Sequence, residues 1–254
     1  MKIYIYTIPK AGTYFLAELV EQMGFVNTGY HISSHSYLDT KAFGAEVNRR
    51  TPSRTKKEAE FLPVLRQMKD REIAFGHFPA AMMPWVFPQF HFICAYRHPK
   101  KTLVAEFLDF RFRRDDVKWV SKEQIPDDKE AFVAYLKRHG HAQVSIFLMM
   151  LTVLHCVTTP QSVHFAPKKY SFVNFDTLRR APAETLERLA GDLGTTTETA
   201  ETAFKRALSA DTKTKATTLD IDREALWSDA AQNWYWQLGF EEIIERAEDL
   251  GWVF

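Results

Sequence analysis

The chain has 254 residues, of which 46% are hydrophobic and 14% aromatic. A chain of this size and composition buries a sizeable core, so we expect one globular domain over residues 1–254. The formal net charge is only +1. This value argues against a general affinity for nucleic acid or for an anionic membrane surface, and it leaves any anion binding to local clusters of charge.

The N-terminus enters a predicted strand almost at once, without an apolar stretch followed by a small-residue cleavage site. The longest apolar run, residues 145–157, is interrupted by Thr152 and His155 and is shorter than a bilayer span. Cys94 and Cys156 stand in apolar surroundings without a CxxC pair. We therefore expect a cytoplasmic protein with two buried free thiols.

Predicted strands and helices alternate along the chain. The first strand ends at Pro9, and a helix follows from about Phe15. Later strands are predicted at 71–78, 91–99 and 170–178, and helices from about 100 and at 129–138, 141–156, 182–194 and 240–252. Residues 48–60 are expected to form a basic loop running into a helix, residues 111–130 a surface excursion or lid, and residues 208–220 a polar loop.

This alternation indicates an α/β protein with a parallel sheet. Ligands of such sheets bind at the carboxyl ends of the strands. Lys10 and Arg97 each follow a predicted strand, so we expect them to face one crevice.

The segment between the first strand and the first helix predicts a phosphate site. A helix N-terminus presents unpaired N–H groups and a positive dipole end, which suit an anion. Gly12 permits a close backbone approach, Lys10 supplies a charge and Thr13 supplies a hydroxyl. The pattern GxxxxGK[ST] is absent, and the lysine precedes the glycine, which argues against a P-loop kinase or NTPase.

Four segments resemble the PAPS-dependent sulfotransferases and occur in that family's order. "PKAGTYF" (9–15) resembles the loop that binds the 5′-phosphosulfate, and "AYRHPKKTLVAEF" (95–107) resembles the 3′-phosphate segment YRxPxDxxxS. "FGHFPAAMMP" (75–84) stands where the family carries its catalytic histidine. "FVNFDTLRRAPAETLERLAGDLG" (172–194) is similar to the YEDL segment. The resemblance implies a three-layer, P-loop NTPase-like fold, with a central parallel sheet flanked by helices.

The resemblance also implies a reaction, the transfer of a sulfonate group from PAPS to a hydroxyl group with PAP as product. Lys10, Ala11, Gly12 and Thr13 would hold the 5′-phosphosulfate. Lys10 would also neutralise the departing phosphate oxygen. No metal is required, because the protein supplies the positive charge.

Two further roles follow from the same resemblance. Arg97 would hold the 3′-phosphate through its planar guanidinium group. His77 would take the proton from the acceptor hydroxyl as that oxygen attacks sulfur. A surface position for Arg97 and a structural role for His77 are the alternative interpretations.

Three positions near the 5′ end depart from the family's pattern. Tyr14 replaces a threonine or serine that contacts the 5′-phosphate, and Phe15 replaces a tryptophan that stacks on adenine. Phe15 fits a core position equally well. Phe75 lies where many members have a second catalytic lysine.

Further departures concern the rest of the nucleotide. Ala105 replaces a serine that shares the 3′-phosphate, and Phe175 replaces the tyrosine of YEDL. The glycine-rich RKG segment of the family is not recognisable, and Lys213 and Lys215 are the candidate substitutes. These losses keep open a degenerate member that binds nucleotide without turnover. A P-loop phosphoryl transferase, which requires Mg²⁺, is the other alternative.

The acceptor cannot be read from the sequence, although a glycan or small metabolite is favoured because no membrane anchor is visible. The oligomeric state is equally open. The basic residues between 49 and 57 form either a solvated face or the rim of an acceptor pocket, with Phe107 and Phe110 among its candidate lining residues. His31 and His35 lack a third ligand pattern and are interpreted as ordinary polar residues.

Overall fold

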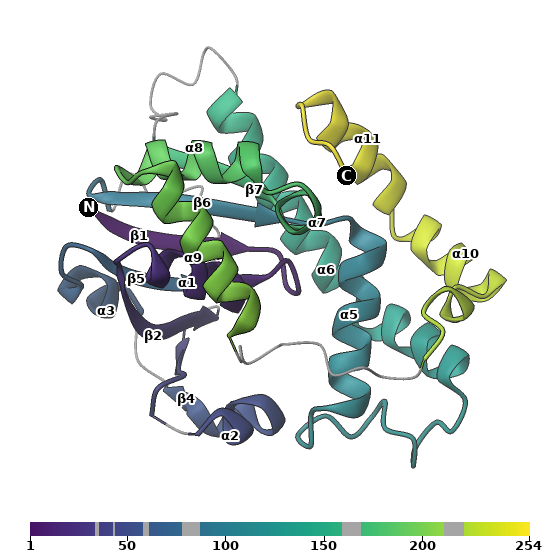
Figure 1. The fold of residues 1–254 in the computed structure, drawn as a ribbon. Helices are drawn as coiled ribbons and strands as arrows, with labels where there is room; N and C mark the ends of the chain where they lie inside the picture. The colour runs from purple at the N-terminus through teal and green to yellow at the C-terminus, as the bar shows by residue number, and fades with distance from the viewer. Residues whose placement is uncertain (34–35, 43, 58–60, 78–86, 159–168, 211–220) are drawn as a thin grey trace.

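A computed structural model covers the chain and describes all residues except 34–35, 43, 58–60, 78–86, 159–168 and 211–220. The strands in chain order are β1 (Lys2–Thr7), β2 (Val26–Ser33), β3 (Ser36–Asp39), β4 (Lys56–Lys57), β5 (Glu72–Gly76), β6 (Phe90–Tyr96) and β7 (Tyr170–Asn174). They form one sheet in the order β4-β3-β2-β5-β1-β6-β7 (Figure 1). β2, β5, β1, β6 and β7 are parallel, whereas β3 and β4 join one edge in antiparallel fashion.

Helices cover both faces of this sheet (Figure 1). Their bounds are α1 (Thr13–Gln22), α2 (Ala45–Arg50), α3 (Phe61–Gln67), α5 (Pro99–Phe112), α6 (Asp128–Thr158), α7 (Phe175–Arg180), α8 (Ala183–Leu193), α9 (Thr197–Ser209), α10 (Asp229–Gln237) and α11 (Phe240–Asp249), with 3₁₀ turns η1 (Pro52–Thr55) and η4 (Glu224–Leu226).

The alternation of β1 explains the three layers. Ile3 and Ile5 lie in the apolar cluster that includes α1, α8 and α9, whereas Tyr4 and Tyr6 lie in the cluster that includes α5, α6, α10 and α11. All four side chains are fully buried, because successive residues of a central strand point to opposite covered faces. The expected three-layer α/β fold with a mostly parallel sheet is confirmed.

Several elements differ from the sequence prediction. β2, β3 and α9 were not expected. β2 carries polar residues, and its register against β5 shifts between Asn27 and His31. The two helices predicted on either side of His139–Gly140 are one continuous helix, α6. A Cβ on Gly140 would lie 2.3 Å from Cδ1 of Leu238. The glycine therefore permits close packing of Leu238 and does not end the helix.

Helix α6 is long and apolar enough to cross a membrane by length and composition alone. Its apolar run thus belongs to a longer helix than the sequence suggested. Phe132, Tyr135 and Phe147 are fully buried in the main core, and the helix packs against α5, α10 and α11. We interpret α6 as a core helix. Cys94 is buried as expected, whereas Cys156 on α6 is only partly buried.

The non-periodic stretch after α5 is organised around Arg111. This arginine is only 6% exposed. It donates hydrogen bonds to the carbonyl oxygens of Val120 at 2.7 Å and Ile125 at 3.0 Å, and to Oδ1 of Asp128 at 2.6 Å. One buried guanidinium group therefore fixes the surface excursion expected in this part of the chain.

Candidate active site

The connection between β1 and α1 is a tight turn with two residues in the left-handed region. The φ angle is 64° at Lys10 and 85° at Gly12. Gly12 is required here because of this angle, and also because a Cβ would lie 2.1 Å from Cε2 of Phe175. The glycine stands at the N-cap of α1 and has no side chain to cap the helix. The first-turn N–H groups of α1 are thus presented at the carboxyl end of the sheet.

His77 directly follows β5 and is held by the neighbouring strands. Its backbone N–H donates to the carbonyl of Ile32 at 3.1 Å. Its ring Nδ1 lies 2.8 Å from the carbonyl oxygen of Thr7 and 3.3 Å from the Thr7 hydroxyl. That hydroxyl lies in turn 2.5 Å from the hydroxyl of Thr13. These contacts join His77 to the first turn of α1 through Thr7.

The contact with Thr7 fixes the tautomer of His77. A carbonyl oxygen only accepts hydrogen bonds, so Nδ1 must carry the ring hydrogen in the neutral imidazole, and Nε2 keeps its lone pair. The pKa of His77 is lowered to about 4, chiefly by burial; the hydrogen bond to the Thr7 carbonyl opposes this shift and the charge of Lys10 adds to it. The ring is therefore neutral at pH 7 and has the tautomer of a proton acceptor at Nε2.

Two of the departures from the family pattern pack together beside His77. The rings of Tyr14 and Phe75 meet edge to face with centroids 5.4 Å apart. The Tyr14 hydroxyl lies 2.7 Å from Nδ1 of His31, and the His31 ring lies 4.9 Å from that of His77. Burial raises the pKa of Tyr14, so its phenol stays neutral. Among the described residues His31 belongs to no cluster that could hold a metal, but it is a buried neighbour of His77 rather than a solvated side chain; His35 lies outside the described residues.

Recognising residues 26–33 as a strand would have been needed to place His31 in the site. β2 pairs with β5, and His31 stands opposite Phe75 in the register. Residues at the carboxyl ends of adjacent parallel strands meet at one edge of the sheet. Because β2 was not predicted as a strand, this neighbourhood of His31 and His77 was not foreseen.

Lys10 does not point freely into solvent. Its Nζ lies 2.8 Å from Oδ2 of Asp109 on α5, and Nη1 of Arg113 lies 3.6 Å from the other carboxylate oxygen. The side chains of Lys10 and Asp109 are only 18% and 12% exposed. Asp109 thus neutralises part of the charge at this junction. The sequence analysis did not foresee Asp109 as the partner of Lys10.

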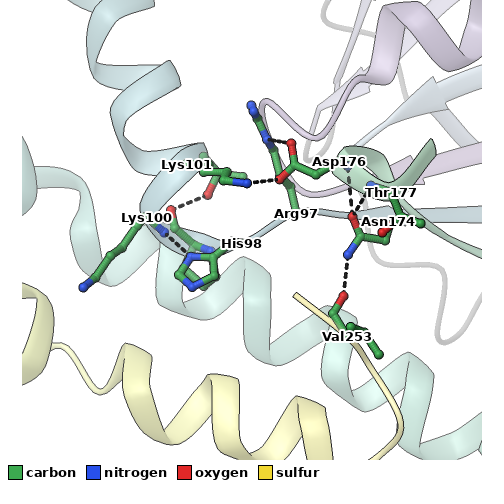
Figure 2. Close-up of polar contacts among 10 residues, drawn as sticks. Arg97, His98, Lys100, Lys101, Asn174, Asp176, Thr177 and Val253 are labelled. Atoms are coloured by element: carbon green, nitrogen blue, oxygen red, sulfur yellow. Dashed lines mark hydrogen bonds and ion pairs between the residues drawn. The ribbon is translucent and has the colours of Figure 1, made fainter. Parts of the chain in front are cut away.

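Arg97 stands where β6 ends, and it pairs with an acid that follows β7. Its Nε donates to Oδ1 of Asp176 at 3.0 Å, and Nζ of Lys101 lies 2.9 Å from Oδ2 (Figure 2). Asn174 caps α7 by accepting from the N–H groups of Asp176 and Thr177. Strands β6 and β7 are parallel neighbours, which explains why two distant segments meet here. Neither Lys101 nor Asp176 was predicted as a site residue.

The strand-to-helix connections that carry Lys10 and Arg97 are the two junctions of the site, and Phe175 contacts both. Its ring lies against Gly12, and the Arg97 guanidinium lies 5.7 Å from its centroid. Phe15 packs edge to face on the same ring at 5.8 Å and is only 7% exposed. Its burial favours the core interpretation of Phe15 over the adenine platform. The phosphate loop and the Arg97 turn therefore belong to one continuous edge of the sheet.

The remaining predicted residues are more scattered. Ala105 lies on α5, the helix that begins at Pro99 shortly after Arg97. Lys213 and Lys215 lie outside the described residues. Phe107 and Phe110 are buried in the core.

An open pocket of about 540 Å³ lies between α2, η1 and the turn after α5. Arg50 and Arg54, from the basic run, line it together with Asp115 and Asp116. The Arg50 side chain pairs with Asp115 at 3.1 Å. This pocket has walls of both charges, and its residues Asp115 and Asp116 follow the end of α5, the helix that carries Asp109.

Comparisons with known proteins agree with this architecture. A sulfotransferase domain model matches residues 1–248. The solved structure of mouse sulfotransferase SULT7A1 complexed with PAP has a TM-score of 0.55 at 17% identity, covering 98% of this chain and 87% of that one. Retinol dehydratase in complex with androsterone and inactive cofactor PAP has a TM-score of 0.60 at 12% identity, covering 100% and 82%. Comparison with curated protein sequences found no match.

At these identities the structural likeness establishes the fold alone, whereas the domain model covers nearly the whole chain. The phosphate-loop turn, the neutral histidine after β5 and the arginine after β6 lie on the carboxyl edge of that fold. The chain belongs to the sulfotransferase family.

Proposed function

We propose that the chain transfers a sulfonate group from PAPS to a hydroxyl group of a carbohydrate or small-molecule acceptor. One observation carries the proposal: two cationic junctions, at Lys10 and Arg97, adjoin each other through the contact of Gly12 with Phe175. PAPS carries a 5′-phosphosulfate and a 3′-phosphate, so it requires two separate anion sites on one edge.

The turn at 10–13 suits the 5′ end of the donor. Gly12 lacks a side chain, so the Phe175 ring packs directly against the turn, and the N–H groups of the first turn of α1 donate to the phosphosulfate oxygens. Thr13 offers a hydroxyl, whose hydrogen bond to Thr7 holds it beside His77. The PAPS donor supplies the activated sulfonate, and the protein supplies orientation and charge.

His77 acts as general base in this proposal. Its Nε2 takes the acceptor proton while the acceptor oxygen forms a bond to sulfur and the bond from sulfur to the phosphate oxygen breaks. A pKa of about 4 makes the free protein's imidazole a weak base. Negative groups bound beside Lys10 would oppose that residue's charge and raise the pKa of His77. Donor binding therefore prepares the base.

Lys10 stabilises the negative charge that builds on the leaving phosphate oxygen. In the free protein its ammonium group is paired with Asp109, which competes with the phosphate for it. When the donor binds, the Lys10 ammonium group exchanges the carboxylate of Asp109 for the donor's phosphate as its ion-pair partner. The polar pocket lined by Arg50 and Asp115 supports a hydrophilic acceptor.

Thermal denaturation with added nucleotides tests the donor. We expect PAP to raise the melting temperature without added metal, and by more than ADP does, because ligands that bind the native state stabilise it. Stabilisation by ATP–Mg²⁺ without any by PAP would favour a phosphoryl transferase.

Turnover is then measured as the release of PAP from PAPS in the presence of a panel of sugars and small hydroxyl compounds. Acceptor-dependent release of PAP supports the proposal. Binding of PAP without release, across the panel and across pH, would identify a nucleotide-binding member without turnover.

A further inference from the structure

Two cations share the single carboxylate of Asp176. Arg97 approaches Oδ1 at 3.0 Å and Lys101 approaches Oδ2 at 2.9 Å (Figure 2). Arg97 and Asp176 by themselves would carry no net charge. Lys101 therefore leaves one positive charge unbalanced within this trio, at the place proposed to receive the 3′-phosphate.

The position of the carboxylate is set by its backbone. The N–H of Asp176 donates to Oδ1 of Asn174 at 2.9 Å, and Asn174 accepts a second bond from Thr177 at 3.0 Å. The side chains of Arg97 and Asp176 are 20% and 25% exposed, whereas that of Lys101 is 56% exposed. Asp176 thus holds a guanidinium and an ammonium group next to each other, and Lys101 is the more exposed of the two.

Of the two consecutive lysines at the start of α5, only Lys101 directs its side chain to Asp176. Its neighbour Lys100 points away from Asp176 (Figure 2). Nζ of Lys100 lies 5.0 Å from the ring centroid of Tyr235 and 5.5 Å from that of Trp227. Consecutive helix residues do not share a face, so only Lys101 joins Arg97.

The same face of α5 continues to Ala105, which lies four residues after Lys101. Its methyl group offers no hydrogen bond to a phosphate. Arg97 binds Asp176 through Nε, and within the described part of the chain no residue hydrogen-bonds its terminal Nη groups. These groups and Nζ of Lys101 are the donors at this corner.

We propose that Lys101 is a second cation for the 3′-phosphate and so determines the preference for a 3′-phosphorylated nucleotide, an inference that rests on the proposed function. A phosphate monoester carries about 1.5–2 negative charges at pH 7, more than one guanidinium balances. Asp176 aligns the two cations before the ligand arrives, which reduces the ordering that binding requires. Lys101 thus supplies a second donor at a corner where Ala105 offers none.

The test is calorimetric titration of the full chain with PAP and with adenosine 5′-phosphate, which lacks the 3′-phosphate. We expect Lys101→Ala to reduce the ratio of the two affinities about 3- to 10-fold, within the range for a charge-assisted contact at a half-exposed site. Lys101→Arg should retain most of the preference. The matched control Lys100→Ala should leave the ratio unchanged, because that side chain contacts aromatic rings instead.

The outcomes separate this inference from the function on which it rests. Failure of the unmodified chain to prefer PAP would overturn the proposed donor and this inference together. A normal preference in Lys101→Ala would overturn the inference alone. An equal loss for both nucleotides, in Lys101→Ala and in a second variant, Lys101→Gln, would assign Lys101 a purely structural role and overturn the inference as well.

Discussion

The two junctions of the site keep their charges in different surroundings. At the first, Lys10 and Asp109 are 18% and 12% exposed, and His77 is tied to Thr7. At the second, Lys101 is 56% exposed and Asp176 25%. Water and salt screen the second cluster more than the first. We therefore expect changes at the first junction to alter rate and fold, and changes at the second to alter affinity.

The largest effect is expected for His77→Ala. Loss of a general base lowers turnover by about 10²–10⁴-fold, while PAP binding should survive because His77 is not proposed to hold a phosphate. Steady-state kinetics and PAP titration measure the two quantities. His141→Ala, at an exposed histidine of α6, is the control. Near-normal turnover in His77→Ala would transfer the role of base to another residue, with Asp109 tested first.

The pH profile sharpens this prediction. The imidazole accepts a proton only when neutral, so kcat/KM for the free protein should fall as the pH drops through about 4. An ordinary histidine would give this limb near 6.5. The acid limb of kcat reports the enzyme–substrate complex. It should lie at higher pH than the acid limb of kcat/KM, because the anionic groups of the bound donor raise the pKa of His77. Coincident limbs would contradict the coupling of donor binding to His77.

The same shift affects stability. Above pH 6.5 the ring is neutral in both the folded and unfolded states, so His77 contributes no pH dependence there. Between pH 6.5 and about 4 the unfolded state binds the extra proton. The native state should therefore lose stability as the pH falls through this window, and His77→Gln should reduce that loss in denaturant titrations.

Lys10→Ala should reduce turnover by about 10²–10³-fold, the range for removal of one group that stabilises developing charge. Its effect on PAP affinity should be smaller, because the lysine is most useful when the leaving oxygen gains charge. Single-turnover rates with saturating PAPS separate the two. Unchanged turnover would show that Lys10 serves only its ion pair with Asp109.

At the second junction, Arg97→Ala should weaken PAP binding about 10- to 100-fold while changing the affinity for adenosine 5′-phosphate little. The estimate corresponds to the loss of about 1.5–3 kcal/mol from a hydrogen bond to a charged group. Calorimetry with both nucleotides measures it. An equal loss for both would place Arg97 away from the 3′-phosphate or indicate a folding defect.

The smallest effect is expected for Asp109→Asn. Removing the carboxylate that pairs with Lys10 leaves the ammonium group for the phosphate, so PAP affinity should rise about 2- to 10-fold. The control is Asp115→Asn, whose carboxylate pairs with Arg50 instead. Weaker PAP binding in Asp109→Asn would mean that Asp109 aligns Lys10 for the donor.

Local patterns predicted the elements that carry the strongest signals. The continuous apolar run of β6, stopped before Pro99, and the strand–glycine–helix pattern around Gly12 both have the predicted form. β2 was missed because its polar residues 27–29 hide the alternation, and the break predicted near Gly140 was wrong because Leu238 packs there. These errors concern residues whose conformation depends on distant partners.

Local sequence patterns were sufficient to predict the α/β class and the strand–glycine–helix turn, because short-range sterics and hydrophobic periodicity specify both. The resemblance of four segments to the sulfotransferases added the candidate roles of the residues. The partners of the charged and titratable side chains in the site, in contrast, depend on long-range packing. Lys10 meets Asp109, Arg97 meets Asp176 and His77 meets Thr7 across parallel strands and their connections. Such pairs form where the order of the strands brings the ends of different strands together, and that order depends on the packing of the whole sheet.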